Sequence, residues 1–350
     1  MLVPILRFND FTESYKSALF EDICTIQTGK SNTQDRVEKG TFPFFVRSAK
    51  VEHSDKYLFD CEAVLTVGDG QIGEIFHYFN GKFDCHQRVY ILNEFRNITG
   101  KYLYYYFATH FYKRVKRMSA KNTVDSVRME MISKMRITHP SVKEQERVAD
   151  LLSLLDEKIS LQRRKVELLK DYKKGIGDVL FHPTSSWVRI KIGDTMTIMH
   201  GKDYKDYLKF DGKYPVYGTS GIIARCEKYL CNWPCVCIGR KGTINRPRYI
   251  NEPFWSVDTL FYSKPKKGFD PLFQYYLFQR INWEKFSEAS GVPSLSASTI
   301  ENIVVDCPTI EEQKRIAYIM YTIDECVEKE ESFAQLLRKY KNGLLNQLFV

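Results

Sequence analysis

The sequence predicts a mixed α/β (α+β) chain, in which two similar domains with short-strand cores are separated by two long, paired, antiparallel helices in an internal pseudo-two-fold repeat. Three observations lead to this prediction. Residues 140–181 and 308–349 align without a gap at an offset of 168, with 14 identities among 42 pairs. The segments before them also match, more weakly, at an offset of 172. Both closely matching segments carry apolar residues at helical spacing.

The weaker match covers the front half of each unit. Gly29-Lys30 aligns with Gly201-Lys202, and Gly70-Gln71-Ile72 aligns with Gly242-Thr243-Ile244. The residues between these anchors differ, although their order is kept. This pattern predicts one scaffold that carries two different recognition surfaces.

The long helices are the clearest elements. Ser141 with Glu144, and Thr309 with Glu312, are typical of capping boxes at their starts. A heptad-like apolar seam follows in each: Val148, Leu152, Leu155, Ile159, Val166, Leu169, Ile176 and Leu180, then Ile316, Ile323, Val327, Ala334, Leu337 and Leu348. A helix of about 40 residues is roughly 60 Å long, more than one small domain buries. We therefore expect the two helices to pair and to hold the domains apart.

These patterns divide the chain into six parts. In chain order they are a lead-in, a first domain, a central helix, a linker, a second domain and a C-terminal helix: 1–19, 20–139, 140–181, 182–187, 188–307 and 308–350.

Composition narrows the functional class. The net charge of +9 favours an anionic partner, although it does not choose between nucleic acid and a membrane surface. The chain has no apolar run near the ~18 residues of a spanning helix and no signal-peptide pattern, so we expect a soluble cytoplasmic protein. An odd number of cysteines, nine, predicts reduced, mostly buried thiols.

A glycine-rich loop, Gly68-Asp69-Gly70-Gln71-Ile72-Gly73, satisfies the dinucleotide-binding pattern but lacks the helix that pattern needs. The hairpin signal Asn80-Gly81 follows instead, so we expect strand, turn and strand. The loop at 239–248 in the second unit is basic, which favours phosphate contact over a merely solvated turn.

Other enzymatic and metal motifs are incomplete. Gly29-Lys30-Ser31 resembles the end of a P-loop, but Cys24 occupies the place of the first glycine. Four cysteines at 226–237 lack paired C-x-x-C spacing, and they indicate a buried strand rather than zinc. No amino-methylation motif or nuclease carboxylate cluster is recognisable. The chain is therefore predicted to be a binding protein and not an enzyme.

In architecture the chain resembles the specificity subunit of type I restriction–modification systems. Two segments ending in Pro-Ser/Thr-x-x-Glu-Gln carry the resemblance, at 132–145 and 300–313. The other segments are Val3–Phe8, Tyr172–Gly175, Tyr340–Gly343 and Val292–Ser296. The first unit matches the last of these only loosely, at residues 122–127.

The resemblance implies a function. Two target-recognition domains would each read one half of a bipartite double-stranded DNA target. The helices would set the gap and dock two methyltransferase (modification) subunits, and restriction/translocase subunits would complete the complex. No cofactor would bind this chain; S-adenosylmethionine belongs to the methyltransferase, and ATP and Mg to the restriction subunit. No membrane partner is expected.

The candidate DNA-binding residues lie near predicted loops and combine cationic, amide, hydroxyl and acidic groups. They are Lys30, Arg47, Asp69, Gln71, His86, Arg88, Lys116, Arg117, Lys121, Lys202, Tyr204, Lys205, Ser220, Arg240, Lys241, Thr243, Asn245, Arg246 and Arg248. Among these, Asp69 with Gln71 and Thr243 with Asn245 are favoured for base reading. Four leucines off the helix seam are candidates for partner docking: Leu151, Leu154, Leu161 and Leu168. We expect no catalytic and no metal-binding residues.

Three other functions stay open at this point. A free-standing two-domain DNA-binding or architectural protein would use the same domains without a methyltransferase. An enzyme with an unrecognised site would show turnover by the purified chain alone. A coiled-coil scaffold would bind no duplex even at low salt. The off-seam leucines have an alternative role in packing against the domains.

Overall fold

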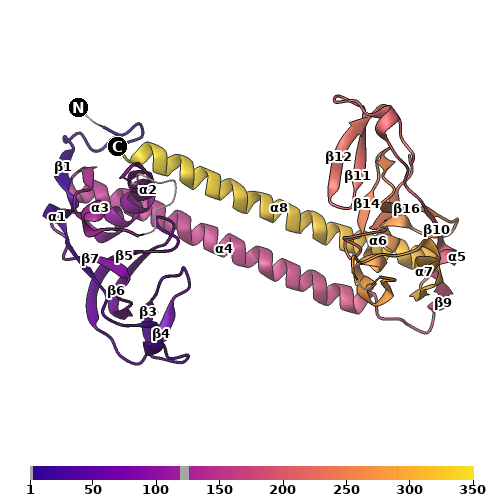
Figure 1. Cartoon of the computed structure of the whole chain (residues 1–350), viewed down its shortest axis with the longest axis horizontal. Helices are drawn as coiled ribbons and strands as arrows, with labels where there is room; N and C mark the ends of the chain where they lie inside the picture. Colours follow the sequence, from indigo (N-terminus) through magenta and orange to yellow (C-terminus); the bar gives the residue numbers. More distant parts are fainter. Residues whose placement is uncertain (1–2, 119–125, 290) are drawn as a thin grey trace. The chain divides into compact units, whose positions relative to one another are not determined.

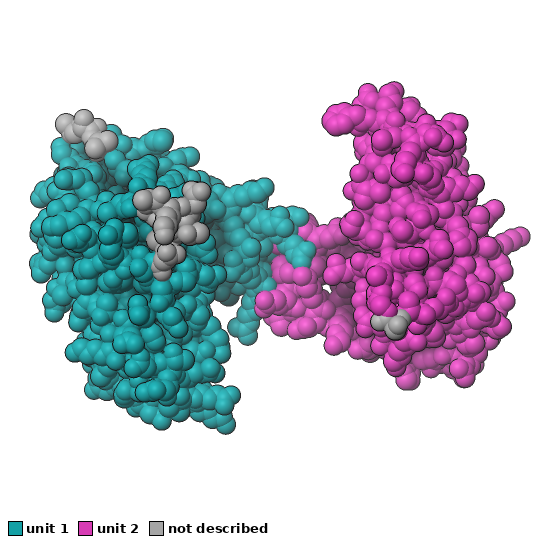
Figure 2. Space-filling view, viewed as in Figure 1, with its two compact units in different colours: residues 1–164, 331–350 teal, residues 165–330 magenta. Residues whose placement is uncertain are grey.

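The computed structural model describes residues 3–118, 126–289 and 291–350. The chain forms two compact units (Figure 2): Met1–Arg164 with Glu331–Val350 is unit 1, and Lys165–Glu330 is unit 2. Two 39-residue helices, α4 (Val142–Leu180) and α8 (Ile310–Leu348), each contribute one part to each unit.

The main sheet of unit 1 has six strands in the order β2-β7-β5-β6-β3-β4. Their bounds are Thr25–Thr28, Val89–Asn93, Phe59–Val67, Phe76–Cys85, Phe42–Phe45 and Glu52–Ser54. All neighbours are antiparallel except β3 and β6, which are parallel. The remaining elements of unit 1 are β1 (Lys16–Leu19), α1 (Phe20–Ile23), η1 (Thr33–Asp35), α2 (Gly100–Met118), α3 (Met129–Ser133) and β8 (Arg136–His139). Strand β1 pairs with β8.

The expected turn at Asn80-Gly81 is wrong. Both residues lie inside β6, where Asn80 pairs with Glu62 and Gly81 with Cys61 of β5. The ladder of a long strand pair outweighs the local turn preference of this dipeptide, and Gly81 takes φ 131° within the strand. The glycine-rich loop at 68–73 joins β5 to β6, as the strand–turn–strand prediction required.

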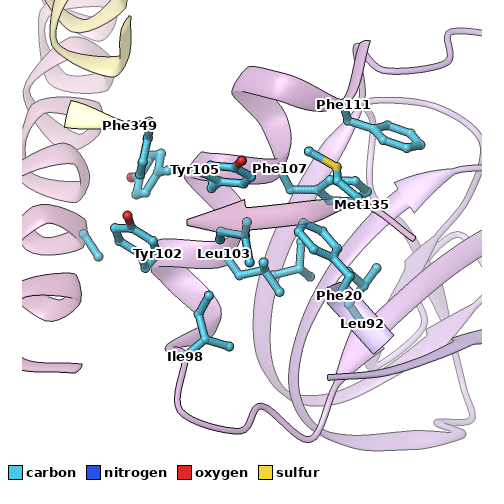
Figure 3. Close-up of a cluster of buried hydrophobic side chains, with 14 of the residues drawn as sticks. Phe20, Leu92, Ile98, Tyr102, Leu103, Tyr105, Phe107, Phe111, Met135 and Phe349 are labelled. Carbon is cyan, nitrogen blue, oxygen red and sulfur yellow. The ribbon is translucent and has the colours of Figure 1, made fainter. Parts of the chain in front are cut away.

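The core of unit 1 lies between the sheet and α2 (Figure 3). Phe20, Leu103 and Phe107 are fully buried there. The end of α8 joins the same core, since the Phe349 ring lies 5.2 Å from that of Tyr102, centroid to centroid. The C-terminal part of α8 is thereby an integral part of unit 1.

Unit 2 repeats this order with shorter sheets. Its elements are β9 (Val188–Lys191), α5 (Ile192–Thr195), β10 (Met196–Met199), η2 (Lys205–Tyr207), β11 (Tyr214–Gly218), β12 (Gly221–Cys226), β13 (Cys235–Gly239), β14 (Arg248–Ile250), β15 (Trp255–Ser256), β16 (Leu260–Pro265), α6 (Pro271–Arg280), η3 (Trp283–Phe286), α7 (Ala297–Asn302) and β17 (Val304–Cys307). The sheets run β10-β16-β13-β14, β12-β11-β15 and β17-β9. Figure 1 shows these elements in sequence colours.

The structure confirms the internal repeat. β1, α1 and β3 begin 172 residues before β9, α5 and β11, and β8 and α4 begin 168 residues before β17 and α8. The parallel pair β3–β6 recurs as β11–β15.

The repeated Gly-Lys marks a close backbone approach in both units. A Cβ on Gly29 would lie 2.2 Å from the Cys85 carbonyl oxygen, and one on Gly201 would lie 1.9 Å from that of Val257. The next residue then donates its N–H to the approached strand: Lys30 to Cys85 O, and Lys202 to Ser256 O. Only glycine permits this approach, which explains the repeated pair.

The long helices run antiparallel in each unit. In unit 1, Lys341 of α8 pairs with Asp156 of α4 (2.5 Å), and Leu337 and Leu344 share a core with Leu155. In unit 2, Lys165 and Lys173 of α4 pair with Glu330 and Asp324 of α8 (2.6 and 2.5 Å). Partner numbers fall along α8 as they rise along α4, which confirms the predicted direction.

The two helix starts are built differently from the predicted capping boxes. At α8, the Glu312 N–H donates to Thr309 Oγ1 (3.4 Å), which completes half of a box. At α4, the buried Glu144 carboxylate instead accepts from Arg7 and Tyr15 of the lead-in. The lead-in is thus fastened to the first turn of α4. Of the helices in the described ranges, none is long and apolar enough to cross a membrane.

Candidate nucleic-acid interface and helix faces

Five of the candidate residues of unit 1 lie in the loops and turns where several strands of its sheet end, a region called here the sheet edge of unit 1. The guanidinium of Arg47 lies 3.3 Å from the Asp69 carboxylate in the β5–β6 loop. That loop is tied to the β6–β7 turn, since Gly68 N–H donates to Arg88 O. The same turn holds His86. The Lys30 N–H donates to the carbonyl oxygen of Cys85, the residue before His86. The edge therefore combines three cations, an acid and an imidazole.

His86 has a defined protonation state at this edge. The Arg88 N–H donates to Nδ1 (3.0 Å), so Nδ1 is unprotonated and Nε2 carries the hydrogen. Burial, and then the nearby Arg47, lower the pKa of His86. A neutral imidazole with a fixed N–H donor suits the reading of a base acceptor.

The other candidates of unit 1 lie around the same loop. Gln71 is exposed next to Gly70, which has φ 76°. Tyr112 of α2 packs against Gly73, and the exposed Lys116 and Arg117 follow one turn later. Lys121 lies outside the described residues.

The corresponding edge of unit 2 is formed by three turns. The β11–β12 turn brings Gly221 beside the Arg248 guanidinium and the Thr219 methyl beside Gly239. The Arg240 N–H donates to Thr259 O, and the Lys202 N–H donates to Ser256 O of β15. Ser220, Lys241, Thr243 and Arg246 lie on the same turns.

Four candidates of unit 2 have individual settings. The Asn245 amide donates to Glu284 (3.1 Å), which occupies one of its two N–H groups. Tyr204 and Lys205 lie at η2, next to Asp203, whose carboxylate accepts from the Lys205 N–H. Arg248 Nε is buried without a hydrogen-bond partner in the described part of the chain.

Two equivalent networks join each domain to both long helices. In unit 1, Tyr105 of α2 donates to Asp156 of α4 (2.8 Å), which also pairs with Lys341 of α8. In unit 2, Tyr276 of α6 donates to Asp324 of α8 (2.8 Å), which pairs with Lys173 of α4. The sequence reasoning missed these networks, although Asp156/Asp324 and Lys173/Lys341 are identical pairs in the repeat.

A buried glutamine anchors the start of each long helix. Gln145 Oε1 accepts from Thr99 N–H (2.9 Å), and its Nε2 donates to Asn97 O and Pro140 O. Gln313 repeats the contact with Asp270 N–H and Pro308 O, both at 2.9 Å. The repeated Glu-Gln therefore has a structural role: it fixes α2 and α6 against α4 and α8.

The candidate docking leucines divide into two groups. Leu151 is partly buried against the core of unit 1, as the packing alternative required. Leu154, Leu161 and Leu168 are 65%, 62% and 60% exposed at heptad spacing. Leu168 and Tyr172 have equally exposed repeat counterparts in Leu336 and Tyr340 of α8. Each unit therefore presents an exposed Leu-x-x-x-Tyr pair.

The four clustered cysteines of unit 2 take no part in these surfaces. Cys226, Cys231, Cys235 and Cys237 are buried, and the last two lie in β13, as the buried-strand prediction required. A hydrogen bond with the Cys235 thiol, and then burial, raise the pKa of Cys231, so this group is a poor nucleophile. Across the described ranges, no three metal-binding side chains come together.

Comparison with known proteins identifies a family. The family model described as type I restriction modification DNA specificity domain matches residues 13–171 and 184–337. A putative type I specificity subunit of Mycoplasma pneumoniae is 22% identical over 85% of this chain and 86% of its own length. The MjaVIII specificity subunit of Methanocaldococcus jannaschii is 24% identical over 81% of this chain and 77% of its own.

Solved structures agree on the fold. The S subunit of a type I restriction–modification system from M. genitalium superposes with a TM-score of 0.74 and 18% identity, covering 100% of this chain and 99% of that one. A chain from a study of type I R-M complex assembly has a TM-score of 0.59 and 14% identity, covering 97% and 98%. With its two matched domains, this chain belongs to the family of type I restriction–modification DNA specificity domains.

Proposed function

We propose that this chain is the non-catalytic specificity subunit of a type I restriction–modification complex, in which each unit reads one half of a bipartite DNA target through its sheet edge. The observation that carries this proposal is the recurrence of one edge with different side chains. Asp69, Gln71 and His86 have the repeat counterparts Lys241, Thr243 and Asp258. One scaffold with two chemistries suits two unlike half-sites.

The two edges differ in their balance of base-reading and phosphate-binding side chains. The edge of unit 1 offers an amide, an imidazole N–H and a carboxylate beside Arg47 and Arg88, a set that favours base reading. The edge of unit 2 carries Arg240, Lys241 and Arg246 close together, so phosphate contacts contribute more of its affinity. Unit 2 should therefore account for the larger part of the salt dependence of DNA binding.

The long helices set the gap between the half-sites and dock the partners. Two methyltransferase subunits bind the exposed Leu-x-x-x-Tyr pairs, Leu168/Tyr172 and Leu336/Tyr340, which the repeat supplies twice. Restriction subunits complete the complex. S-adenosylmethionine then belongs to the methyltransferase, and ATP and Mg to the restriction subunit, in the cytoplasm where the DNA lies.

The test is co-purification with the methyltransferase encoded beside this chain, followed by genome-wide mapping of methylated adenines. A split motif should appear only when this chain is present. Gln71→Thr should then change bases in one half of the motif, and Thr243→Gln should change bases only in the other. Absence of a complex and of chain-dependent methylation would refute the proposal in favour of a free-standing DNA-binding protein.

A further inference from the structure

One ion pair at the sheet edge of unit 1 lies where two parallel strands end. β3 and β6 run parallel, and Arg47 and His86 follow their ends, where the His86 N–H donates to Phe45 O (2.9 Å). Asp69 meets Arg47 from the β5–β6 loop, with its carboxylate 3.3 Å from Arg47 Nη1. Burial and then Arg47 lower the pKa of His86, and Asp69 opposes them, so the three side chains share one small area.

The loop that carries Asp69 is fixed on both sides. The Gly68 N–H donates to Arg88 O, and the Gly68 carbonyl accepts from the Val127 N–H, both at 2.7 Å. The Asp69 side chain is 21% exposed, whereas that of Arg47 is 51% exposed. The carboxylate is therefore the fixed partner of the ion pair, and the guanidinium is the partner that an incoming molecule can reach.

The ion pair uses only one nitrogen of the guanidinium. Both contacts with the Asp69 oxygens start from Arg47 Nη1, at 3.3 and 3.5 Å, and Arg47 Nε and Nη2 have no hydrogen-bond partner in the ranges that the structure describes. Arg7 of the same chain shows what this side of an arginine can bind, because its Nε and Nη2 donate to the two oxygens of Glu144 at 2.9 and 2.8 Å. Arg47 therefore presents two adjacent donors while Asp69 holds its third nitrogen.

Two adjacent donors match one base in the major groove of DNA. Guanine presents two acceptors there, N7 and O6, whereas adenine presents an acceptor and a donor. Thymine presents an acceptor and a methyl group, and cytosine presents a donor. A carboxylate could accept from cytosine, but the Asp69 oxygens already face Arg47. The pair as a whole is thus complementary to guanine.

Unit 2 does not contain this ion pair. At the offset of 172, Arg47 corresponds to Thr219 and Asp69 corresponds to Lys241, so both the guanidinium and the carboxylate are replaced. A threonine hydroxyl and a lysine ammonium do not form a planar pair of donors. The arrangement is therefore specific to unit 1, and the half-site of unit 2 should not respond when it is removed.

We infer that Arg47 reads a guanine in the half-site of unit 1 through its Nε–H and Nη2–H, and that Asp69 is the positioning residue that orients the guanidinium. This inference rests on the proposed function and extends it, because it names one base of the DNA target and gives Asp69 a role other than direct reading. An arginine that a neighbouring acid already holds loses less side-chain freedom when it binds, which sharpens its discrimination between bases.

The first experiment maps methylated adenines in cells whose complex contains the parent chain or one variant of it. One half of the parent motif should contain an invariant guanine. Arg47→Ala should accept other bases at that position and keep the rest of the motif, and Asp69→Asn should relax the same position to a smaller extent. The matched control Arg36→Ala removes an arginine of similar exposure (47%) from its ion pair with Glu52, and it should leave the motif unchanged.

Duplexes with 7-deazaguanine at that position test the contact itself, because this base has C–H in place of the N7 acceptor. The parent complex should bind such a duplex at least about fivefold more weakly than the guanine duplex, and the Arg47→Ala complex should bind both alike. If Arg47→Ala weakens binding equally for all sequences, Arg47 contacts phosphate; if only Asp69→Asn relaxes the motif, the carboxylate reads the base. Either result overturns the inference and leaves the proposed function standing, whereas methylation that does not depend on this chain refutes both.

Discussion

The buried glutamines at the helix starts lead to a quantitative prediction. Gln145→Leu keeps the side-chain volume but removes every polar group, so Thr99 N–H and Asn97 O lose their partner, while Pro140 O still lies 3.0 Å from His139 Nδ1. A stranded buried backbone group costs about 1–3 kcal/mol, and Asn97 is exposed so that its carbonyl can bind water; the loss at Thr99 N–H should therefore lower the free energy of unfolding by about 1–3 kcal/mol. Gln313→Leu strands Asp270 N–H and Pro308 O, and should cost about 2 kcal/mol or more.

The two substitutions can be separated by their reporters. All four tryptophans, at positions 187, 233, 255 and 283, lie in unit 2, so intrinsic fluorescence follows the unfolding of that unit. Far-UV circular dichroism follows both units. Urea titration should therefore show Gln313→Leu shifting the fluorescence transition, and Gln145→Leu shifting chiefly the dichroism transition.

The control is Gln335→Leu, at an exposed position of α8. Such a surface change should stay within about 0.5 kcal/mol of the parent chain. If Gln145→Leu unfolds at the same urea concentration as this control, the glutamine does not fasten α2 to α4, and the role assigned to the repeated Glu-Gln is wrong.

Three further predictions concern other parts of the chain. Gly29→Ala should destabilise unit 1 by about 1–3 kcal/mol because its Cβ meets backbone, whereas Gly175→Ala in open space on α4 should stabilise by roughly 0.5–1 kcal/mol; thermal unfolding compares the two. Burial lowers the pKa of His77 and His110 in the folded chain. Below about pH 6.5 the unfolded chain therefore binds more protons than the folded chain, so the unfolding midpoint should fall as the pH drops through about 6.5. An unchanged midpoint between pH 7.5 and 5.5 would refute this. Arg240→Ala should reduce the slope of log K against log salt for DNA binding by about 1, and an unchanged slope would exclude a phosphate contact there.

Much of the fold was readable from the sequence because the repeat reports on packing. Two of the identical pairs make the same contact in both units: Gln145 and Gln313 at the helix starts, and Asp156 and Asp324 at the helix junctions. The seam of α4 was predicted because a 39-residue helix repeats its apolar spacing many times. The Asn80-Gly81 prediction failed because a two-residue preference cannot report the ten-residue strand that contains it.

The candidate recognition residues were predictable as a region but not as individual contacts. Sequence offsets placed Asp69 and Lys241 on equivalent loops, and the structure gathers Lys30, Arg47 and His86 around the first of them. The pairing of Asn245 with Glu284 joins residues 39 positions apart, and no local pattern encodes it.

The repeat also distinguishes contacts that both units share from side chains that differ between the two units. Contacts that join each domain to the helices are duplicated, as in Tyr105–Asp156–Lys341 and Tyr276–Asp324–Lys173, so each unit holds its domain against the helix pair through the same three residue types. The exposed Leu-x-x-x-Tyr pair is duplicated as well, whereas the side chains at the two candidate recognition edges are not. Asp69, Gln71 and His86 stand opposite Lys241, Thr243 and Asp258, and under the proposed function this difference lets one scaffold read two unlike half-sites.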